Sequence, residues 1–401
     1  MATSAKALDA LAAVCGDVRP GEPEEGVLGV EPALVAAPSS VDEAAGVMRV
    51  AAALGLAVVP RGGETRLDWG APPARCDLLV DTRRLDALLE HTSGDLVVSA
   101  QAGMPMERLA EVLAERGQRL ALDVPLPGST VGGTIATAAA GPLRTLYGTP
   151  RNLVIGLTIV RADGQVARSG GKVVKNVAGY DLGRLFCGSF GTLGLIVEAT
   201  FRLHPVPAAR AWVTRDVDGP KQAYEAVQAV LHSPVAASAV EYIGPGKVAV
   251  LLEGVPDGLS LRARTTAGLL GGDAEIGGDP PAGWGRYPDG TTLIDVTAPP
   301  TALPDLLATA GTAVTWNGDG HGHVGLPAGS PPDVAVRLLG ALRDVLGAHR
   351  GGAVVRYAPE DVREAVDAWG PVPALALMRR VKDQFDPDHR LSPGRFVGGI
   401  R

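Results

Sequence analysis

Glycine-rich turns between apolar segments are the parts of this chain best suited to chemistry. The first turn is Pro60-Arg61-Gly62-Gly63-Glu64-Thr65, and it directly follows an apolar segment. Successive backbone amides in such a turn can form a nest that binds a phosphate, and Thr65 adds a hydroxyl donor. A tight turn that needs two glycines for its own geometry explains this segment equally well.

A second glycine pair lies where a helix is predicted to begin, in Gly128-Ser129-Thr130-Val131-Gly132-Gly133. Unpaired amides at a helix start, together with the positive end of the helix dipole, favour a bound anion. Two such sites would suit the two phosphates of one dinucleotide. The alternative is a capped helix whose glycines only allow close packing.

A third cluster, Gly188-Ser189-Phe190-Gly191-Thr192-Leu193-Gly194, precedes a predicted strand that contains Ile196. Glycines there would set bare backbone against a planar ring. Lys172, Lys175 or Arg184 would place positive charge near the anionic edge of a flavin, although surface exposure explains each of them as well. The three clusters together predict bound FAD. The expected cofactor contacts are Arg61, Gly62, Gly63, Glu64, Thr65, Gly128, Ser129, Thr130, Gly132, Gly133, Asn176, Gly188, Gly191, Thr192, Gly194 and Ile196.

Two histidines, His321 and His323, form the other notable group. The surrounding Gly320-His321-Gly322-His323-Val324-Gly325 satisfies a dinucleotide-binding pattern, but a Pro-rich loop follows it instead of a helix, so that function is not expected. On a strand, both rings would share one face and could supply a general base. Two ligands without an evident carboxylate do not make a metal site, so no metal is predicted. A solvated loop position is the alternative.

Composition limits the remaining possibilities. The chain has 401 residues, 46% of them hydrophobic, which predicts two ordered domains. A net charge of −7 with scattered Lys and Arg argues against nucleic acid or an anionic membrane as partner. Cys15, Cys76 and Cys187 lie too far apart for an iron–sulfur or zinc motif. Free thiols suit a reducing cytoplasm, and no uncharged apolar stretch reaches the ~18 residues of a membrane span.

The predicted elements place these motifs at strand ends and helix starts. Ser40-Val41-Asp42-Glu43 is a capping box opening a helix to about residue 53. A hairpin is expected around Ala162-Asp163-Gly164. Glycine clusters become rare after about residue 208, where a domain boundary is expected. Further strands are predicted at 56–60, 77–81 and 95–101, and further helices at 104–116, after 132, at 332–349 and at 372–385.

Several of these segments resemble the FAD-binding domain shared by vanillyl-alcohol-oxidase-type (PCMH-type) flavoproteins. The segments are 60–65, 128–133, 148–156 and 171–205. Lys175-Asn176-Val177-Ala178-Gly179-Tyr180-Asp181-Leu182, with Gly141-Pro142-Leu143-Arg144 before it, is similar to the FAD-binding subunits of bacterial glycolate oxidases. Asp386-Pro387 and Ser392-Pro393-Gly394-Arg395 resemble their ending, where Asn is usual at 392.

The resemblance implies an α+β fold in three parts. A two-subdomain PCMH-type FAD-binding domain would cover residues 1–208, an α+β cap domain 209–372, and a C-terminal segment, 373–401, would return to the FAD domain. Glu64 replaces a third glycine of the usual phosphate loop, and its carboxylate would either weaken phosphate binding or turn outward. No histidine occupies this loop, so FAD is expected to be non-covalent.

The expected activity is FAD-dependent oxidation of a short 2-hydroxy acid such as glycolate or D-lactate. A base, His321 or His323, would take the hydroxyl proton while a hydride leaves the α-carbon for the flavin. An arginine would clamp the carboxylate, with Arg395 favoured over Arg144 and Arg356 by motif position. The resemblance implies a related flavin subunit and an iron–sulfur subunit as partners. A flavin-bearing assembly subunit without turnover, and a stand-alone alcohol or sugar oxidase, are the alternatives.

Overall fold

The computed structural model describes residues 2–172, 181–271, 273–311 and 313–400, which form two compact units. Unit 1 comprises the chain up to residue 139, residues 149–205 and the chain from 371 onward; unit 2 comprises 140–148 and 206–370. These edges lie close to the expected limits at 208 and 372. The stretch 140–148 differs from the expectation, because Leu143 belongs to a hydrophobic cluster of unit 2 with Trp212.

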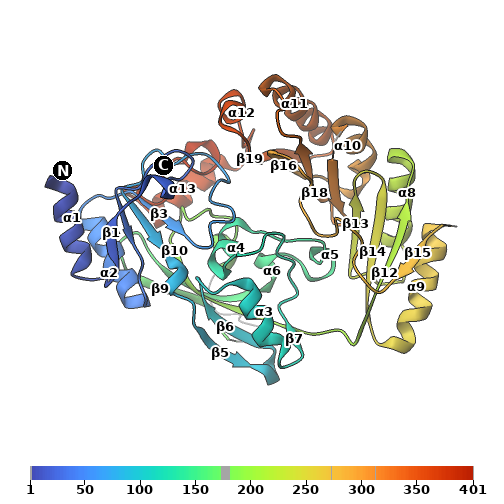
Figure 1. Ribbon diagram of the computed structural model, residues 1–401, viewed down its shortest axis with the longest axis horizontal. Helices are drawn as coiled ribbons and strands as arrows, with labels where there is room; N and C mark the ends of the chain where they lie inside the picture. Colours follow the sequence, from blue (N-terminus) through green and yellow to red (C-terminus); the bar gives the residue numbers. More distant parts are fainter. Residues whose placement is uncertain (1, 173–180, 272, 312, 401) are drawn as a thin grey trace. The chain divides into compact units, whose positions relative to one another are not determined.

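The first sheet of unit 1 is mostly parallel. Strands β2, β4 and β3 run parallel, and β1 pairs antiparallel at one edge (Figure 1). Every residue of β2 and β4 is buried, as expected for strands covered on both faces. Helices α1 and α2 share a core with this sheet. The elements are β1 (Val18–Pro20), β2 (Leu34–Ala36), β3 (Val58–Arg61), β4 (Leu78–Asp81), α1 (Ala2–Ala12) and α2 (Val41–Ala53).

The start of α2 corrects one detail of the sequence analysis. The Ser40 hydroxyl accepts from the Glu43 amide at 3.1 Å, as a capping box requires. The Glu43 carboxylate, however, accepts from the amide of Ser39 at 2.7 Å, one residue before the cap. The expected helix is confirmed, but the reciprocal bond reaches one residue further back.

The second sheet of unit 1 is antiparallel, in the order β5-β6-β10-β8-β9. The predicted hairpin is confirmed as β8 and β9: the Arg161 amide donates to the Gln165 carbonyl at 2.9 Å across a turn in which Gly164 has φ +81°. The strands are β5 (Leu88–Thr92), β6 (Val97–Gln101), β8 (Val154–Val160), β9 (Val166–Gly170) and β10 (Leu195–Arg202), with a small pair β7 (Gln118–Arg119) and β11 (His204–Pro205) beside them.

Short helices and the returning C-terminal segment complete unit 1. After α13, the chain lies alongside β3: the Val58 amide donates to the Arg390 carbonyl and the Ser392 amide donates to the Val58 carbonyl, both at 2.8 Å. The end of the chain is therefore an added edge of the first sheet. The remaining helices are α3 (Met106–Ala114), α4 (Val131–Thr137), α6 (Pro150–Leu153), α7 (Gly183–Phe186) and α13 (Leu375–Phe385).

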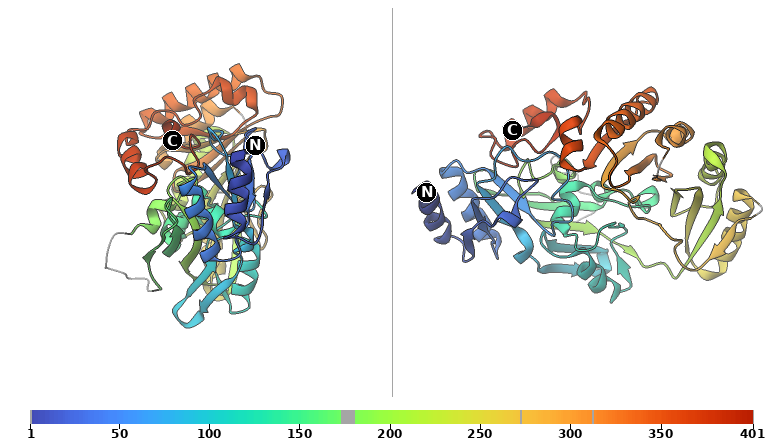
Figure 2. Two further views of the ribbon diagram at one scale, coloured as in Figure 1. Left: turned by 90° about the vertical axis from the view of Figure 1, so that its left-hand side faces the viewer. Right: turned by 45° about the horizontal axis from the view of Figure 1, so that its top comes forward.

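Unit 2 is an eight-stranded antiparallel sheet whose longer helices pack on one face, visible in Figure 1 and again from a second direction in Figure 2. Its strand order is β15-β12-β14-β13-β17-β18-β16-β19. The strands are β12 (Ala209–Asp216), β13 (Ala239–Ile243), β14 (Lys247–Gly254), β15 (Glu275–Gly277), β16 (Thr292–Thr297), β17 (Ala313–Asn317), β18 (His321–Leu326) and β19 (Gly352–Tyr357). The helices are α5 (Arg144–Tyr147), α8 (Gly219–Leu231), α9 (Pro256–Leu270), α10 (Leu303–Ala310), α11 (Pro332–Ala348) and α12 (Glu360–Ala365).

Side-chain alternation separates the two faces of this sheet. Val324 and Leu326 of β18 join the large hydrophobic core under the helices. His321 and His323 occupy the alternate positions of the same strand, so both rings lie on the opposite face. Among the helices that the described ranges contain, none is long and apolar enough to cross a membrane.

Candidate functional site

The loop after β3 presents a row of backbone amides in unit 1. Within the described part of the chain, the amides of Gly62, Gly63, Glu64 and Thr65 donate to no protein oxygen. A Cβ on Gly63 would lie 1.9 Å from the Gly128 carbonyl oxygen, so glycine is required where the two loops meet. Consecutive amides without acceptors are the chemical definition of an anion nest.

Glu64 does not point its charge at this nest. Its φ is +63°, a conformation that a third glycine would adopt without strain. Its carboxylate Oε1 lies 3.4 Å from Arg61 Nη1 and 3.6 Å from Arg83 Nη1. The carboxylate is therefore turned to two guanidinium groups, and the departure from the usual loop leaves room for a phosphate.

Arg61, at the end of β3, pairs with carboxylates of β4 and of the turn at 23–25. It is buried, with Nη1 2.8 Å from Glu25 Oε1 and Nη2 2.8 Å from Asp81 Oδ2. Burial opposes ionisation of Asp81, but hydrogen bonds from Arg83 together with the charge and hydrogen bond of Arg61 outweigh it and lower the pKa of that carboxyl. Because two carboxylates compensate the charge of Arg61, this residue contributes little net charge to a bound phosphate.

The second loop differs from its prediction. Helix α4 begins at Val131, whose amide donates to the Met104 carbonyl at 3.0 Å. The Gly132 amide donates to the Ala102 carbonyl at 2.7 Å. The Gly133 amide donates to the Thr130 hydroxyl at 3.3 Å. The expectation of unpaired amides at this helix start is wrong, because the amides of Val131, Gly132 and Gly133 all donate hydrogen bonds within the protein. A Cβ on Gly132 would lie 2.9 Å from the Ala102 Cβ, so close packing explains this glycine.

The nest opens into a cavity whose empty space, with the adjoining open solvent included, is about 770 Å³. Predicted contacts that line it are Arg61, Gly62, Gly63, Glu64, Thr65, Thr130, Gly132, Gly133, Gly191, Gly194 and Ile196. Residues that the sequence analysis did not name as cofactor contacts include Arg66, Thr82, Thr137, Phe190, Ser392 and Arg395. The lining thus combines segments that are far apart in the sequence.

Four predicted contacts lie outside the lining, because their polar groups are used elsewhere. The Gly128 amide donates to Glu107 at 2.8 Å, and the Ser129 hydroxyl donates to the Leu126 carbonyl at 2.7 Å. The Gly188 amide donates to Ile135 at 3.0 Å, and the Thr192 hydroxyl donates to Ser189 at 2.6 Å. These residues shape the loops around the cavity. Asn176 lies outside the described residues.

Lys172 and Arg184, two of the three cations considered for the flavin edge, do not line the cavity. Lys172 pairs with Glu90, and Arg184 Nε lies 2.8 Å from Asp181 Oδ2. The side chains of both cations are more than half exposed, and neither lines the cavity. Lys175 lies outside the described residues.

Arg395 lies in the cavity wall of unit 1. Its Nη2 donates to the carbonyls of Leu67 and Trp69, both at 2.8 Å, while its buried Nη1 has no partner among the described residues. Burial lowers its pKa to about 10, which still leaves the side chain charged near neutral pH. The structure therefore places the predicted carboxylate clamp beside the nest loop.

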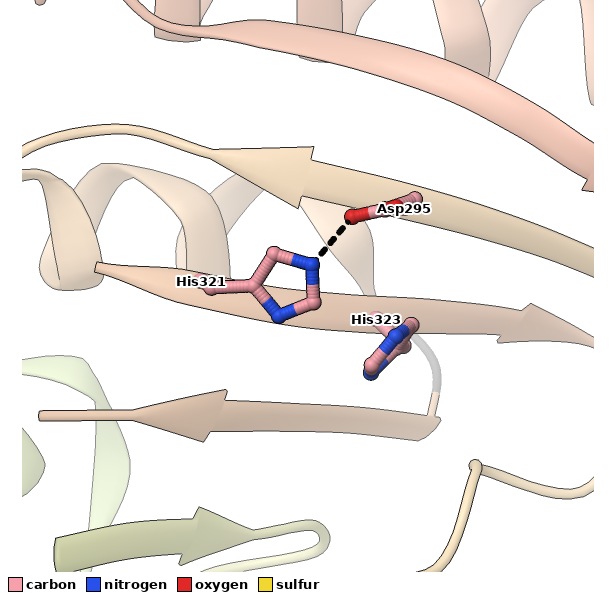
Figure 3. Close-up of side chains that lie close together, drawn as sticks. All are labelled: Asp295, His321 and His323. Carbon is pink, nitrogen blue, oxygen red and sulfur yellow. Dashed lines mark ion pairs between the residues drawn. The ribbon is translucent and has the colours of Figure 1, made fainter. Parts of the chain in front are cut away.

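The two histidines belong to a buried polar cluster on β16, β18 and β19 of unit 2. His321 Nε2 lies 2.7 Å from Asp295 Oδ1, and Figure 3 shows the His323 ring beside this pair. Arg356 holds the other oxygen, with Nε 2.5 Å from Asp295 Oδ2. The His321 and His323 rings are 4.8 Å apart and nearly perpendicular. The expectation that both rings share one face is confirmed, and the alternative of a loop position is wrong.

The charges of this cluster are fixed by its partners. Burial opposes ionisation of Asp295, but Arg356 and then His321 hold its pKa well below the usual value. Burial, followed by repulsion from His321, lowers the pKa of His323 to about 3, so His323 is neutral. The centroids of the His323 and Tyr287 rings are 4.7 Å apart. The Nδ1 atom of His323 is 3.4 Å from the Thr315 hydroxyl.

The sequence analysis missed Asp295. This carboxylate brings a third possible metal ligand within 4.8 Å of His321 and His323. Its two oxygens, however, face His321 and Arg356, so a cation would compete with a guanidinium already in place. The absence of a metal stays a prediction. The available signal was a single aspartate inside the otherwise apolar segment Thr292–Thr297.

The fold and the cavity define an FAD-binding flavoprotein of α+β architecture. Residues 32–170 match the family model described as FAD binding domain, which includes the nest loop, α4 and the β8–β9 hairpin. FAD is accordingly the cofactor, and one relative similar over most of this chain is named as an FAD-linked oxidoreductase. Among solved structures, p-cresol methylhydroxylase with substrate bound shares the fold, with a TM-score of 0.77 at 15% identity over 98% of this chain and 97% of that one.

Curated relatives fall in the same class. An uncharacterised FAD-linked oxidoreductase of Mycobacterium tuberculosis (strain H37Rv) is 29% identical over 92% of this chain and 91% of its own length. A D-2-hydroxyglutarate dehydrogenase of Xanthomonas citri pv. viticola is 41% identical, over 44% of this chain and 38% of its own length. A glycolate oxidase subunit of Bacillus subtilis is 30% identical, over 58% of this chain and 50% of its own length. The matches to the last two span half or less of those relatives.

Proposed function

We propose that this protein oxidises a short 2-hydroxy acid and passes the electrons to a partner protein. Bound FAD supplies the two-electron acceptor for such a reaction. Two relatives support the substrate class, since one is a D-2-hydroxyglutarate dehydrogenase and the other a glycolate oxidase subunit. Conversion of a 2-hydroxy acid to the 2-oxo acid removes the α-hydrogen with its two bonding electrons, which the FAD would accept, and the hydroxyl proton, which requires a base.

The observation that carries the proposal is the environment of His321. Its Nε2 lies 2.7 Å from Oδ1 of the ionised Asp295, which orients the ring. Its Nδ1 is buried and has no hydrogen-bond partner among the described residues, so a neutral ring with its hydrogen on Nε2 would offer this nitrogen as a proton acceptor. An imidazole oriented by a carboxylate is the usual arrangement of a general base. His321 is therefore the proposed base.

His323 has a different role in this proposal. Its low pKa of about 3 makes it a weak proton acceptor near neutral pH. It packs edge-on against His321 and so limits the movement of that ring. The proposal thus gives different roles to two histidines that could not be distinguished from the sequence.

Anaerobic flavin reduction tests the proposal. The FAD-loaded full chain is mixed with D-2-hydroxyglutarate, D-lactate or glycolate, and the visible flavin absorbance is followed. We expect at least one acid to bleach the wild type, and His321→Asn to slow bleaching by about 10²–10⁴-fold, the usual contribution of a general base. His349→Asn is the control, because His349 pairs with Asp305 near the surface of the same unit. A wild type that no acid reduces, or His321→Asn at wild-type rate, would contradict the proposal.

A second candidate is a flavin-bearing assembly subunit that turns over no substrate. The arginines considered in unit 2 for clamping a carboxylate are already paired: Arg144 Nε lies 2.6 Å from Asp319 Oδ2, and Arg356 pairs with Asp295. The relative named as a glycolate oxidase subunit supports a complex, in which a related flavin subunit and an iron–sulfur subunit are the proposed partners. FAD that stays oxidised with every acid in the isolated chain, but is reduced after those subunits are added, would favour this candidate.

A further inference from the structure

Arg66 is a buried cation that forms no ion pair with a carboxylate of the described residues. It is 6% exposed and lines the cavity directly after the nest. Its Nη1 donates to the Ser129 hydroxyl at 2.9 Å and lies 3.4 Å from the Thr65 hydroxyl. Its Nε and Nη2 are buried and have no partner in the described part of the chain. Two of its three nitrogens therefore lack any acceptor.

The protein contacts of Arg66 do not compensate its charge. Both hydroxyl partners are neutral, and the Trp69 ring, 5.4 Å from Arg66 Cζ, offers only a cation–π attraction. No carboxylate of the described residues lies within ion-pair distance of Arg66. The neighbouring Arg61 differs in this respect, because Glu25 and Asp81 neutralise it. A buried guanidinium without an anion is unfavourable, so the fold is expected to receive one.

We propose that Arg66 binds the pyrophosphate of FAD, as the cationic complement to the amide nest at 62–65. A guanidinium is well suited to phosphate oxygens, because its planar nitrogens donate in parallel. Ser129 holds Nη1, which leaves Nε and Nη2 to form this fork. Amides alone provide partial charges, and Arg66 adds a full positive charge at the loop. The proposal rests on FAD as the cofactor and is independent of the substrate.

Flavin binding with and without phosphates tests this role. Apoprotein of wild type, Arg66→Gln, Arg66→Lys and the control Arg108→Gln is titrated with FAD and with riboflavin by fluorescence. Arg108 pairs with Asp86 at the surface of the same unit, 2.9 Å away, and lies outside the cavity lining. We expect Arg66→Gln to weaken FAD binding about a hundredfold, the loss typical of a bidentate charged contact, and riboflavin binding to stay at the wild-type value. Arg66→Lys should fall between the two, and Arg108→Gln should equal wild type.

Inorganic pyrophosphate gives a second readout that needs no flavin. We expect pyrophosphate to raise the melting temperature of wild-type apoprotein and to leave that of Arg66→Gln unchanged. Equal weakening of FAD and riboflavin would assign Arg66 a purely structural role and overturn the proposal, as would unchanged FAD binding. If Arg66→Gln does not fold, Arg66→Lys decides the question by the same comparison, because it retains the charge and loses the fork.

Discussion

Replacement of Asp386 by alanine should destabilise unit 1 and lower its affinity for FAD. Lys382 Nζ, 1% exposed, donates to Asp386 Oδ2 at 2.6 Å and to the carbonyls of Thr192 and Leu391 at 2.9 and 2.8 Å. Asp386 also accepts from the Leu391 amide at 2.7 Å. Burial lowers the pKa of Lys382, and the charge of Asp386 opposes this shift. The pair thus joins α13 to the loop before β10 and to the C-terminal segment.

The magnitude follows from what the substitution leaves behind. Asp386→Ala leaves the buried ammonium of Lys382 without its counter-ion and the amide of Leu391 without its acceptor. Breaking a buried pair in this way lowers the free energy of unfolding by about 3–5 kcal/mol. For a domain of this size, that loss lowers the melting temperature by about 6–20 °C. Ser392 and Arg395 follow this junction and line the cavity, so the affinity for FAD should fall as well.

Thermal unfolding of the apoprotein, followed by circular dichroism, measures the effect. Asp383→Ala is the matched control, because Asp383 is half exposed and pairs with the exposed His389 at 3.2 Å; a change below about 1 kcal/mol is expected. The double variant Lys382→Met with Asp386→Leu should recover most of the loss, since it removes both charges. Wild-type stability of Asp386→Ala, or a double variant as unstable as the sum of its parts, would refute the reasoning.

Three further predictions concern unit 2, the nest and the cofactor. Burial lowers the pKa of His323 to about 3, so its contribution to stability is complete above pH 6.5 and is lost as the pH falls toward 3. His323→Asn should therefore reduce the pH slope of the unfolding free energy between pH 4 and 6 by up to about 1.4 kcal/mol per pH unit, measured by urea unfolding; an unchanged slope would show that His323 is already protonated in the folded protein. Gly63→Ala should abolish FAD retention, because its Cβ would overlap the Gly128 carbonyl at 1.9 Å, whereas Gly94→Ala, with no atom within 4 Å, should bind FAD normally; visible absorbance after gel filtration distinguishes them. Acid precipitation should release all of the FAD into the supernatant, since no histidine, cysteine or tyrosine is among the described residues lining the cavity; flavin retained in the pellet would indicate a covalent bond.

Much of the fold was accessible from the sequence because its signals are local. The hairpin β8–β9 follows from a turn dipeptide between apolar runs, and the start of α2 follows from Ser40 as its cap. Both glycine loops were expected to offer unpaired amides, and of the two only the loop at 62–65 does so in the described part of the chain. Whether an amide is free depends on partners such as Ala102 and Met104, which lie some 30 residues from the amides they bind.

The polar groups of the candidate sites were harder to predict. Asp295 meets His321 only because β16 pairs with β18, and no short pattern encodes that register. Arg66 resembles any charged loop residue in the sequence, and its isolation from carboxylates becomes visible only in three dimensions. For Glu64 the sequence left open whether the carboxylate lies near the phosphate or turns outward, and in the structure it faces Arg61 and Arg83.

The central claim is FAD-dependent oxidation of a 2-hydroxy acid at its α-carbon. The most direct test is anaerobic reduction of the FAD-loaded full chain by D-2-hydroxyglutarate or D-lactate, each supplied with hydrogen or deuterium at the α-carbon. Bleaching of the flavin that slows with deuterium would show that the α-carbon–hydrogen bond breaks in the step that reduces FAD, as predicted. A protein that binds FAD and stays fully oxidised with both acids and with glycolate would contradict the claim.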